Sequence, residues 1–470
     1  MPNPSEKMLE HAKIPGISTA VVSGGKVVSH AVGVTNILNP QPVTDTTVFE
    51  AASLSKPVFA YIVLKMVERG LFSRPGEKPE DGLDRPLHEI FDFEYDLALM
   101  STLPDNNKEK AENGIIYLSE DGQYVVRDPK GVVQEGALNT KEIDLSQLEL
   151  NLRNSDLKSA ILKVTSNAGH THGFGPPHLR DHPNYNLLTV RMILSHQAGL
   201  PNWFEGGPQK YVAPVGTQFD YSGEAFFFLN EVLEKVSGKN FHQLSQELFH
   251  SKDLQMTHSS FIPHADNSPE GNNRAWGHRM DQSVDESLHC EPRNEEKPKP
   301  IPASSLYTTA EDYGKFMNAC MNNSFIRQHM FNPQVALVGK DAKASKAGVT
   351  DDTLSHLHWG LGIGIQTNPD GGKIAFHWGD NGTFRGFTAM DLQTNKGVVC
   401  LTNSENGPLM FRQVAEPVVG DLTPVSQWLT HREQLNLNTT DMYRRVIAVE
   451  KKSSVEANTS PSNVDSFSPK

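Results

Sequence analysis

Apolar positions near the start of the chain predict a strand hairpin followed by a buried helix. Two apolar runs, residues 17–22 and 27–32, flank residues 23–26, whose central glycines suit a tight turn. Further on, an uninterrupted apolar run predicts a helix over residues 53–69, and Gly70 is a plausible C-terminal stop.

The rest of the pattern divides into a helical middle and a strand-rich end. Residues 189–194 and 224–236 read as helices, whereas strand-like runs return at residues 373–376, 386–390 and 397–402. The order of strands, helix, helical middle and strands predicts an α+β fold with an inserted helical lobe.

The composition shifts between residues 91 and 185, which we interpret as an inserted subdomain or lid. Asp121-Gly122 gives a hairpin signal, and residues 143–164 carry helical spacing. Residues 451–470 show no core pattern and are expected to be disordered. The predicted divisions are residues 1–90, the N-terminal part of an α/β lobe; 91–185, the insert; 186–300, the helical lobe; 301–430, the C-terminal part of the α/β lobe; and 431–470, a C-terminal helix and tail.

Composition excludes several classes of protein. The 470 residues are 37% hydrophobic and 21% charged, as in ordinary globular proteins. The net charge of −13 and the lack of a basic stripe argue against nucleic acid as a partner. The three cysteines, Cys290, Cys320 and Cys400, form neither a disulfide framework nor a zinc pattern.

The chain shows no secretory signal at its start and no run of about 20 apolar residues that could span a membrane. We therefore expect a cytoplasmic protein, with export by another route left open. Four histidines cluster in a glycine- and proline-rich loop, but they lack the fixed spacing of a zinc site. They are His170, His172, His178 and His182.

Ser53 and Lys56 are the first candidates for chemistry. Three positions apart at the start of a helix, they share one face, so the amine can touch the hydroxyl. The free N–H groups and partial positive charge of the helix start lie beside the same oxygen, which activates a weak nucleophile without a histidine. The alternative is an ordinary helix start, with Ser53 as cap and Lys56 exposed.

Two further segments could complete such a site. Tyr221-Ser222-Gly223 precedes a helix, and beside Lys56 the phenol could relay a proton; otherwise Tyr221 is a buried anchor. His377 ends a strand beside Gly379, which allows close backbone approach to a ligand; otherwise it is a core or surface histidine.

Together, Ser53-Leu54-Ser55-Lys56, Tyr221-Ser222-Gly223 and His377-Trp378-Gly379 resemble, in order, the three motifs of the serine β-lactamase-like family. The likeness is greatest to its class C branch, which also holds penicillin-binding proteins, D-amino peptidases and esterases. It covers about residues 14–90 and 186–407. Flanking stretches that look similar are Ile14-Pro15-Gly16, residues 194–201, residues 305–312 and Leu401-Thr402-Asn403.

The resemblance implies an antiparallel sheet flanked by helices and a serine hydrolase that needs no cofactor. Ser53 would be acylated, Lys56 and Tyr221 would relay the proton, and His377 would line the cleft. The backbone N–H groups of Ser53 and Asp380 would form the oxyanion hole. The remaining residues implied to line the substrate-binding site are Gly223, Trp378 and Gly379.

Two departures from the family pattern bear on the substrate. Gly223 stands where the second motif usually has asparagine, and His377 stands where β-lactamases more often have lysine. Both favour an esterase or peptidase acting on a small ester, peptide or amide over a β-lactamase. A catalytically weak or inactive binding or scaffolding protein is the alternative. Oligomeric state and the choice between hydrolysis and acyl transfer stay open.

Overall fold

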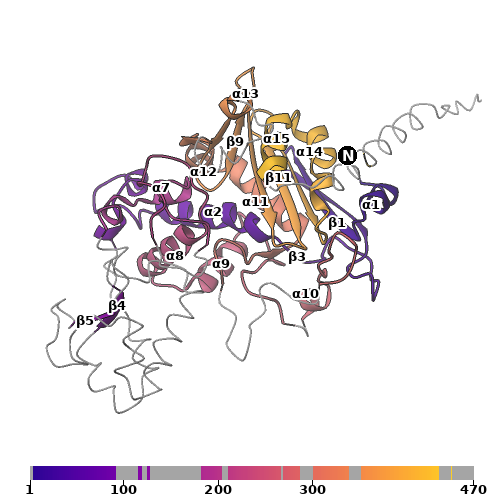
Figure 1. Ribbon diagram of the computed structural model, residues 1–470, viewed down its shortest axis with the longest axis horizontal. Helices are drawn as coiled ribbons and strands as arrows, with labels where there is room; N and C mark the ends of the chain where they lie inside the picture. The colour runs from indigo at the N-terminus through magenta and orange to yellow at the C-terminus, as the bar shows by residue number, and fades with distance from the viewer. Residues whose placement is uncertain are drawn as a thin grey trace, which may run out of the picture.

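The central element of the fold is an eight-stranded antiparallel sheet in the order β2-β1-β12-β11-β10-β9-β8-β7 (Figure 1). The computed structural model describes residues 4–90, 182–203, 210–265, 268–285, 300–337, 351–432 and 446, and the backbone of 115–118 and 124–127. The strands are β1 Gly16–Ser23, β2 Lys26–Gly33, β7 Val335–Ala336, β8 Leu357–Trp359, β9 Gly364–Thr367, β10 Lys373–Asp380, β11 Arg385–Asp391 and β12 Lys396–Thr402.

The predicted hairpin is confirmed, and it joins the two ends of the fold. Ser23 pairs with Lys26, and the two residues between them, Gly24 and Gly25, have φ of 59° and 77°. Positive φ at both central positions is the type I′ geometry that matches strand twist, and glycine adopts it without steric cost. Strand β1 then pairs with β12, almost 400 residues away in the chain.

Helices cover both faces of the sheet, so the predicted α+β class is confirmed. Helix α11 packs on β1, β2 and β12, while α14 packs on β11 and β12. The hydrophobic cluster that includes α11 also includes α2, α7, α8, α9 and α12; a second cluster includes α1, α14 and α15. Their bounds are α1 Glu6–Ala12, α2 Ser55–Glu68, α7 Val190–Leu194, α8 Glu224–Ser237, α9 Phe241–Phe249, α11 Ala310–Asn322, α12 Ser324–Met330, α14 Phe411–Val419 and α15 Thr423–Arg432.

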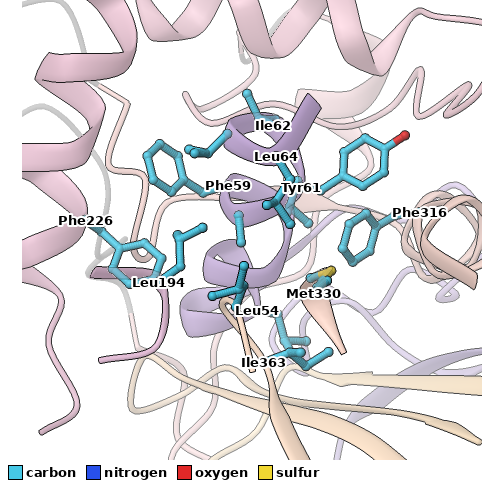
Figure 2. Close-up of a cluster of buried hydrophobic side chains, with 14 of the residues drawn as sticks. Leu54, Phe59, Tyr61, Ile62, Leu64, Leu194, Phe226, Phe316, Met330 and Ile363 are labelled. Atoms are coloured by element: carbon cyan, nitrogen blue, oxygen red, sulfur yellow. The ribbon is translucent and has the colours of Figure 1, made fainter. Parts of the chain in front are cut away.

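Helix α2 is buried on nearly every side, which explains its unbroken apolar sequence. Figure 2 shows its side chains packed against Phe226 and Leu194 on one side and Phe316 on the other. The helix begins two residues later than expected, because Ala52–Leu54 forms a 3₁₀ turn ahead of it, and Ser53 is therefore not its cap. Gly70, with φ of 79°, follows the helix as predicted.

Short elements complete the described parts of the chain. They are β3 Phe49–Glu50, which pairs with β6 Tyr307–Thr308; the 3₁₀ helices η1 Ala52–Leu54, η2 Pro79–Leu83, η3 Leu87–Glu89, η5 Tyr185–Leu187 and η6 Gly407–Met410; and the helices α10 Pro269–Asn272 and α13 Asp351–Ser355. None of the helices in the described ranges has the length and apolar character to cross a membrane.

Within the insert, β4 Ile115–Leu118 and β5 Tyr124–Arg127 pair as antiparallel strands on either side of Asp121-Gly122, in agreement with the hairpin signal. The helix predicted over residues 143–164 and the predicted disordered tail lie outside the described residues, as does Cys290. The five-part division of the chain stays a prediction.

Candidate active site

Ser53 lies in a sharp turn between β3 and α2. Ala52 has φ of 49°, a left-handed conformation that costs a residue with a Cβ on the order of 1–3 kcal/mol. The turn is fixed by Ser55, whose hydroxyl donates to Ala52 O at 2.5 Å and accepts from Leu306 N at 2.9 Å. Ser53 is the one partly exposed residue between Ala51 and Leu64. Its hydroxyl is therefore held at the edge of the core.

Tyr313 on α11 stabilises the same turn through a hydrogen bond. Its phenol donates to Leu54 O at 3.2 Å. Burial raises the pKa of Tyr313 well above its ordinary value. The phenol therefore stays protonated and keeps its donor role over the whole working range of pH.

Lys56 lies within hydrogen-bond distance of Ser53. Its Nζ lies 3.1 Å from Ser53 Oγ and donates to Ala303 O at 3.0 Å. The side chain is fully buried. Its Nζ also lies 4.7 Å from the centre of the Tyr221 ring. The alternative of an exposed first-turn lysine is therefore wrong, and the amine has a fixed position between the serine and the tyrosine.

Tyr221 lies in the loop before α8 and is 5% exposed. Its ring packs on His196, with 4.4 Å between ring centres, and on Trp378, at 5.3 Å. His196 Nδ1 also accepts a hydrogen bond from Ser222 N at 3.0 Å. The histidine thus holds both the ring and the backbone of this loop.

Strand β10 places His377 and Trp378 beside the tyrosine. His377 is fully buried, its ring lies 6.2 Å from that of Tyr221, and its Nδ1 lies 2.7 Å from Trp378 O. Trp378 is 5% exposed and packs against Trp428 of α15 at 5.2 Å. Both side chains therefore support the site from within the core, and contact of either with a substrate stays a prediction.

Gly379 brings β10 against the turn that carries Ser53. A Cβ at this position would overlap Ala51 O, so only glycine permits the observed approach. The next residue, Asp380, forms an ion pair with Arg385 and accepts from Gly382 N at 2.7 Å. The strand end is therefore rigid where its backbone adjoins the turn of Ser53.

The structure thus brings Ser53, Lys56, Tyr221 and His377 together from three segments far apart in the chain. Residues that the motifs alone missed include His196, Trp203 and Ala303. His196 lies in the family-like stretch at residues 194–201, which was the available signal. Among the described residues no group of three potential metal ligands was found, and the His182 ring packs at a tilt against that of Tyr211. His170, His172 and His178 lie outside those residues.

Comparisons with known proteins support the fold. A family model described as Beta-lactamase matches residues 6–416. The octameric penicillin-binding protein homologue from Pyrococcus abyssi is 17% identical, with a TM-score of 0.50 over 85% of this chain and 72% of the other. D-alanine carboxypeptidase AmpC from Burkholderia cenocepacia is 15% identical, with a TM-score of 0.51 over 91% and 95%. At these identities the likeness concerns the fold. None of the curated proteins compared with the chain matches it.

Proposed function

Because the chain belongs to the beta-lactamase family, we propose that it is a serine hydrolase that cleaves an ester or amide through an acyl-enzyme at Ser53. The observation that carries the proposal is the 3.1 Å separation of Lys56 Nζ and Ser53 Oγ. This distance suits direct proton transfer between nucleophile and base.

In the proposed reaction, Ser53 Oγ forms a bond to the substrate carbonyl carbon while its proton passes to Lys56. The carbonyl oxygen becomes an oxyanion, which the backbone N–H groups of Ser53 and Asp380 stabilise. When the tetrahedral intermediate collapses, the bond to the leaving alcohol or amine breaks and the proton returns to the leaving group. Water then attacks the acyl-enzyme by the same route and releases the acid.

Tyr221 is the proposed partner of Lys56 in proton transfer. Its ring lies beside the amine, and its loop is fixed by His196 and Trp378. Such preorganisation matters because a proton relay of this kind typically contributes about 10²–10⁴ in rate. His377 would act through Tyr221, since its ring is buried and lies 6.2 Å from the tyrosine ring.

The site favours an esterase or peptidase over a β-lactamase. Gly223 offers no side-chain amide for a substrate amide, and the buried His377 offers no fixed positive charge to a substrate carboxylate. One of the two similar structures is named as a D-alanine carboxypeptidase and the other as a penicillin-binding protein homologue. A carboxypeptidase cleaves an amide bond, as the proposed acyl-enzyme route would.

Covalent labelling tests the proposal. The full chain is incubated with a fluorophosphonate and analysed by intact mass and peptide mapping. We expect one adduct, on Ser53, in the wild type and in Ser355→Ala, whose exposed serine lies on α13. No adduct is expected in Ser53→Ala. Labelling that persists in Ser53→Ala would remove Ser53 from its proposed role. No labelling together with no turnover of an ester, peptide and β-lactam panel would support the binding-protein alternative.

A further inference from the structure

Gly223 is a glycine because of the space available and not because of its backbone conformation. Its φ of −82° and ψ of −35° are ordinary right-handed values open to any residue. A Cβ here would lie 2.8 Å from Cη2 and 2.9 Å from Cζ3 of Trp203, and 3.0 Å from Asn202 O. The indole and the adjoining backbone therefore fill the place where a side chain at position 223 would begin.

Trp203 is held firmly in this place. Asn202 O accepts from the N–H groups of both Gly223 and Glu224, at 3.1 and 3.2 Å, and its side-chain Oδ1 also accepts from Gly223 N at 3.1 Å. The indole packs edge-to-face on Phe227, with 6.3 Å between ring centres. The segment that carries the tryptophan is thus tied to the start of α8.

The indole also lies next to the proposed chemistry. Its ring centre is 5.8 Å from Lys56 Nζ, which in turn lies 3.1 Å from Ser53 Oγ. Trp203 is only partly buried, unlike Lys56 and Tyr221. Trp203 and Ser53 are thus both only partly enclosed, and both adjoin the Lys56 amine.

We propose that Trp203 replaces a side chain at position 223 as the wall of the acyl pocket, so that the preferred substrates are esters of aromatic or longer alkyl acids. This inference rests on the proposed serine hydrolase function. An aryl or alkyl group gains contact area on the indole. The face of an indole ring offers an acylamino group neither an acceptor for its N–H nor a donor for its C=O, and a buried polar group without partners is disfavoured.

Selectivity between two leaving-group-matched esters tests the substrate class. The ratio of kcat/KM for p-nitrophenyl benzoate to that for p-nitrophenyl acetate is measured in the wild type, Trp203→Phe and Trp203→Ala. We expect the ratio to fall about tenfold in Trp203→Ala, as loss of an apolar wall implies, and to change little in Trp203→Phe. An unchanged ratio in Trp203→Ala would overturn the proposal.

A double-mutant stability cycle, read out as Tm, tests whether Trp203 fills the space beside Gly223. It needs no activity measurement. Gly223→Ala is expected to lower Tm by about 2 °C or more in the wild type, because the new Cβ meets the indole. The same change should cost less than half as much in Trp203→Ala, because two of the three nearest atoms belong to the indole and only Asn202 O of the three remains. Equal costs in both backgrounds would show that Trp203 does not occupy the position.

The outcomes separate this inference from the function on which it rests. A fluorophosphonate adduct on Ser53 together with an unchanged ester ratio leaves the hydrolase standing and removes Trp203 from selectivity. No adduct in any variant removes the hydrolase and the substrate class together, while the stability cycle still decides the packing of Trp203 on Gly223.

Discussion

The two halves of the candidate site are held in place in different ways. Ser53 and Lys56 lie one helical turn apart, so local geometry brings Nζ to 3.1 Å from Oγ. Tyr221 lies on a loop whose position depends on His196 and Trp378, from segments distant in the chain. The comparison teaches that the nucleophile and its base are specified locally, whereas their partner is specified by tertiary packing.

The largest effect on acylation is expected from a change in the locally specified pair, Ser53 and Lys56. Lys56→Met should lower the rate of Ser53 acylation by about 10²–10⁴, because the base is removed. The free energy of unfolding should fall by no more than about 1–3 kcal/mol, which is the cost of leaving Ala303 O without the Nζ donor. Burst kinetics with a p-nitrophenyl ester measure the rate, and urea unfolding measures the stability.

Lys65→Met is the matched control, because Lys65 lies on the same helix and pairs with Glu68. It should acylate at the wild-type rate. Acylation by Lys56→Met at that rate would remove the lysine from proton transfer and would leave the short distance to Ser53 without a chemical role.

The junction between the two halves comes next. Gly379→Ala should slow acylation about a hundredfold, because the new methyl group overlaps Ala51 O and separates β10 from the turn of Ser53. Gly397→Ala on β12 is the control, since its Cβ would meet the flexible Met390 side chain at 3.2 Å. Equal, small effects of both substitutions on kcat/KM would show that Asp380 is not held in place through this contact.

What could be predicted from the sequence follows the same division. The hairpin, α2 and its stop at Gly70, and the Ser53–Lys56 pair depend on residues close together in the chain, and each was predicted. The 3₁₀ turn before α2 was not, because the left-handed Ala52 is held by Ser55 and Leu306. Local propensity disfavours this conformation, so only tertiary contacts can specify it.

The same reasoning applies to Trp203. Its partners Gly223 and Phe227 lie 20 or more residues away, and no short motif marks the contact. The missing asparagine at position 223 was visible in the sequence, but the reason for its absence was not. The structure shows that an indole carbon lies 2.8 Å from where a Cβ would stand, so a side chain at position 223 has no room unless Trp203 moves.

A smaller effect is expected from the part of the site around Tyr221, which tertiary packing holds in place. His196→Leu should slow acylation about tenfold, because Ser222 N loses its acceptor and the Tyr221 ring loses a stacking partner. An unsatisfied buried N–H should also cost about 1–3 kcal/mol of stability. His196→Asn, whose Oδ1 can accept from Ser222 N, should recover most of both.

A split between kcat and KM separates positioning from general destabilisation. If His196 positions the tyrosine, kcat falls in His196→Leu at temperatures where the chain is fully folded. A variant with lowered Tm but wild-type kcat would make the histidine a structural residue alone, and the loop would then need another support.

The smallest effect is a pH-dependent change in stability from His278. Like His196, it accepts a backbone N–H on a ring nitrogen, but it is not one of the residues of the proposed site. Its Nδ1 donates to Asn403 O at 2.9 Å, and its Nε2 accepts from Ile37 N at 3.3 Å. Only the neutral ring can serve both bonds. Burial lowers the pKa of His278, so the unfolded chain binds its proton more tightly than the folded one.

The stabilisation by neutral His278 is therefore fully present above about pH 6.5 and is lost progressively as the pH falls below that value. Tm of the wild type should drop more between pH 7.5 and pH 5 than Tm of His278→Gln, which cannot take up the proton. His11→Gln on the exposed face of α1 should follow the wild type. Parallel Tm profiles for all three proteins would mean that the ring stays neutral down to pH 5, and that long-range histidine contacts in this fold do not respond to acid.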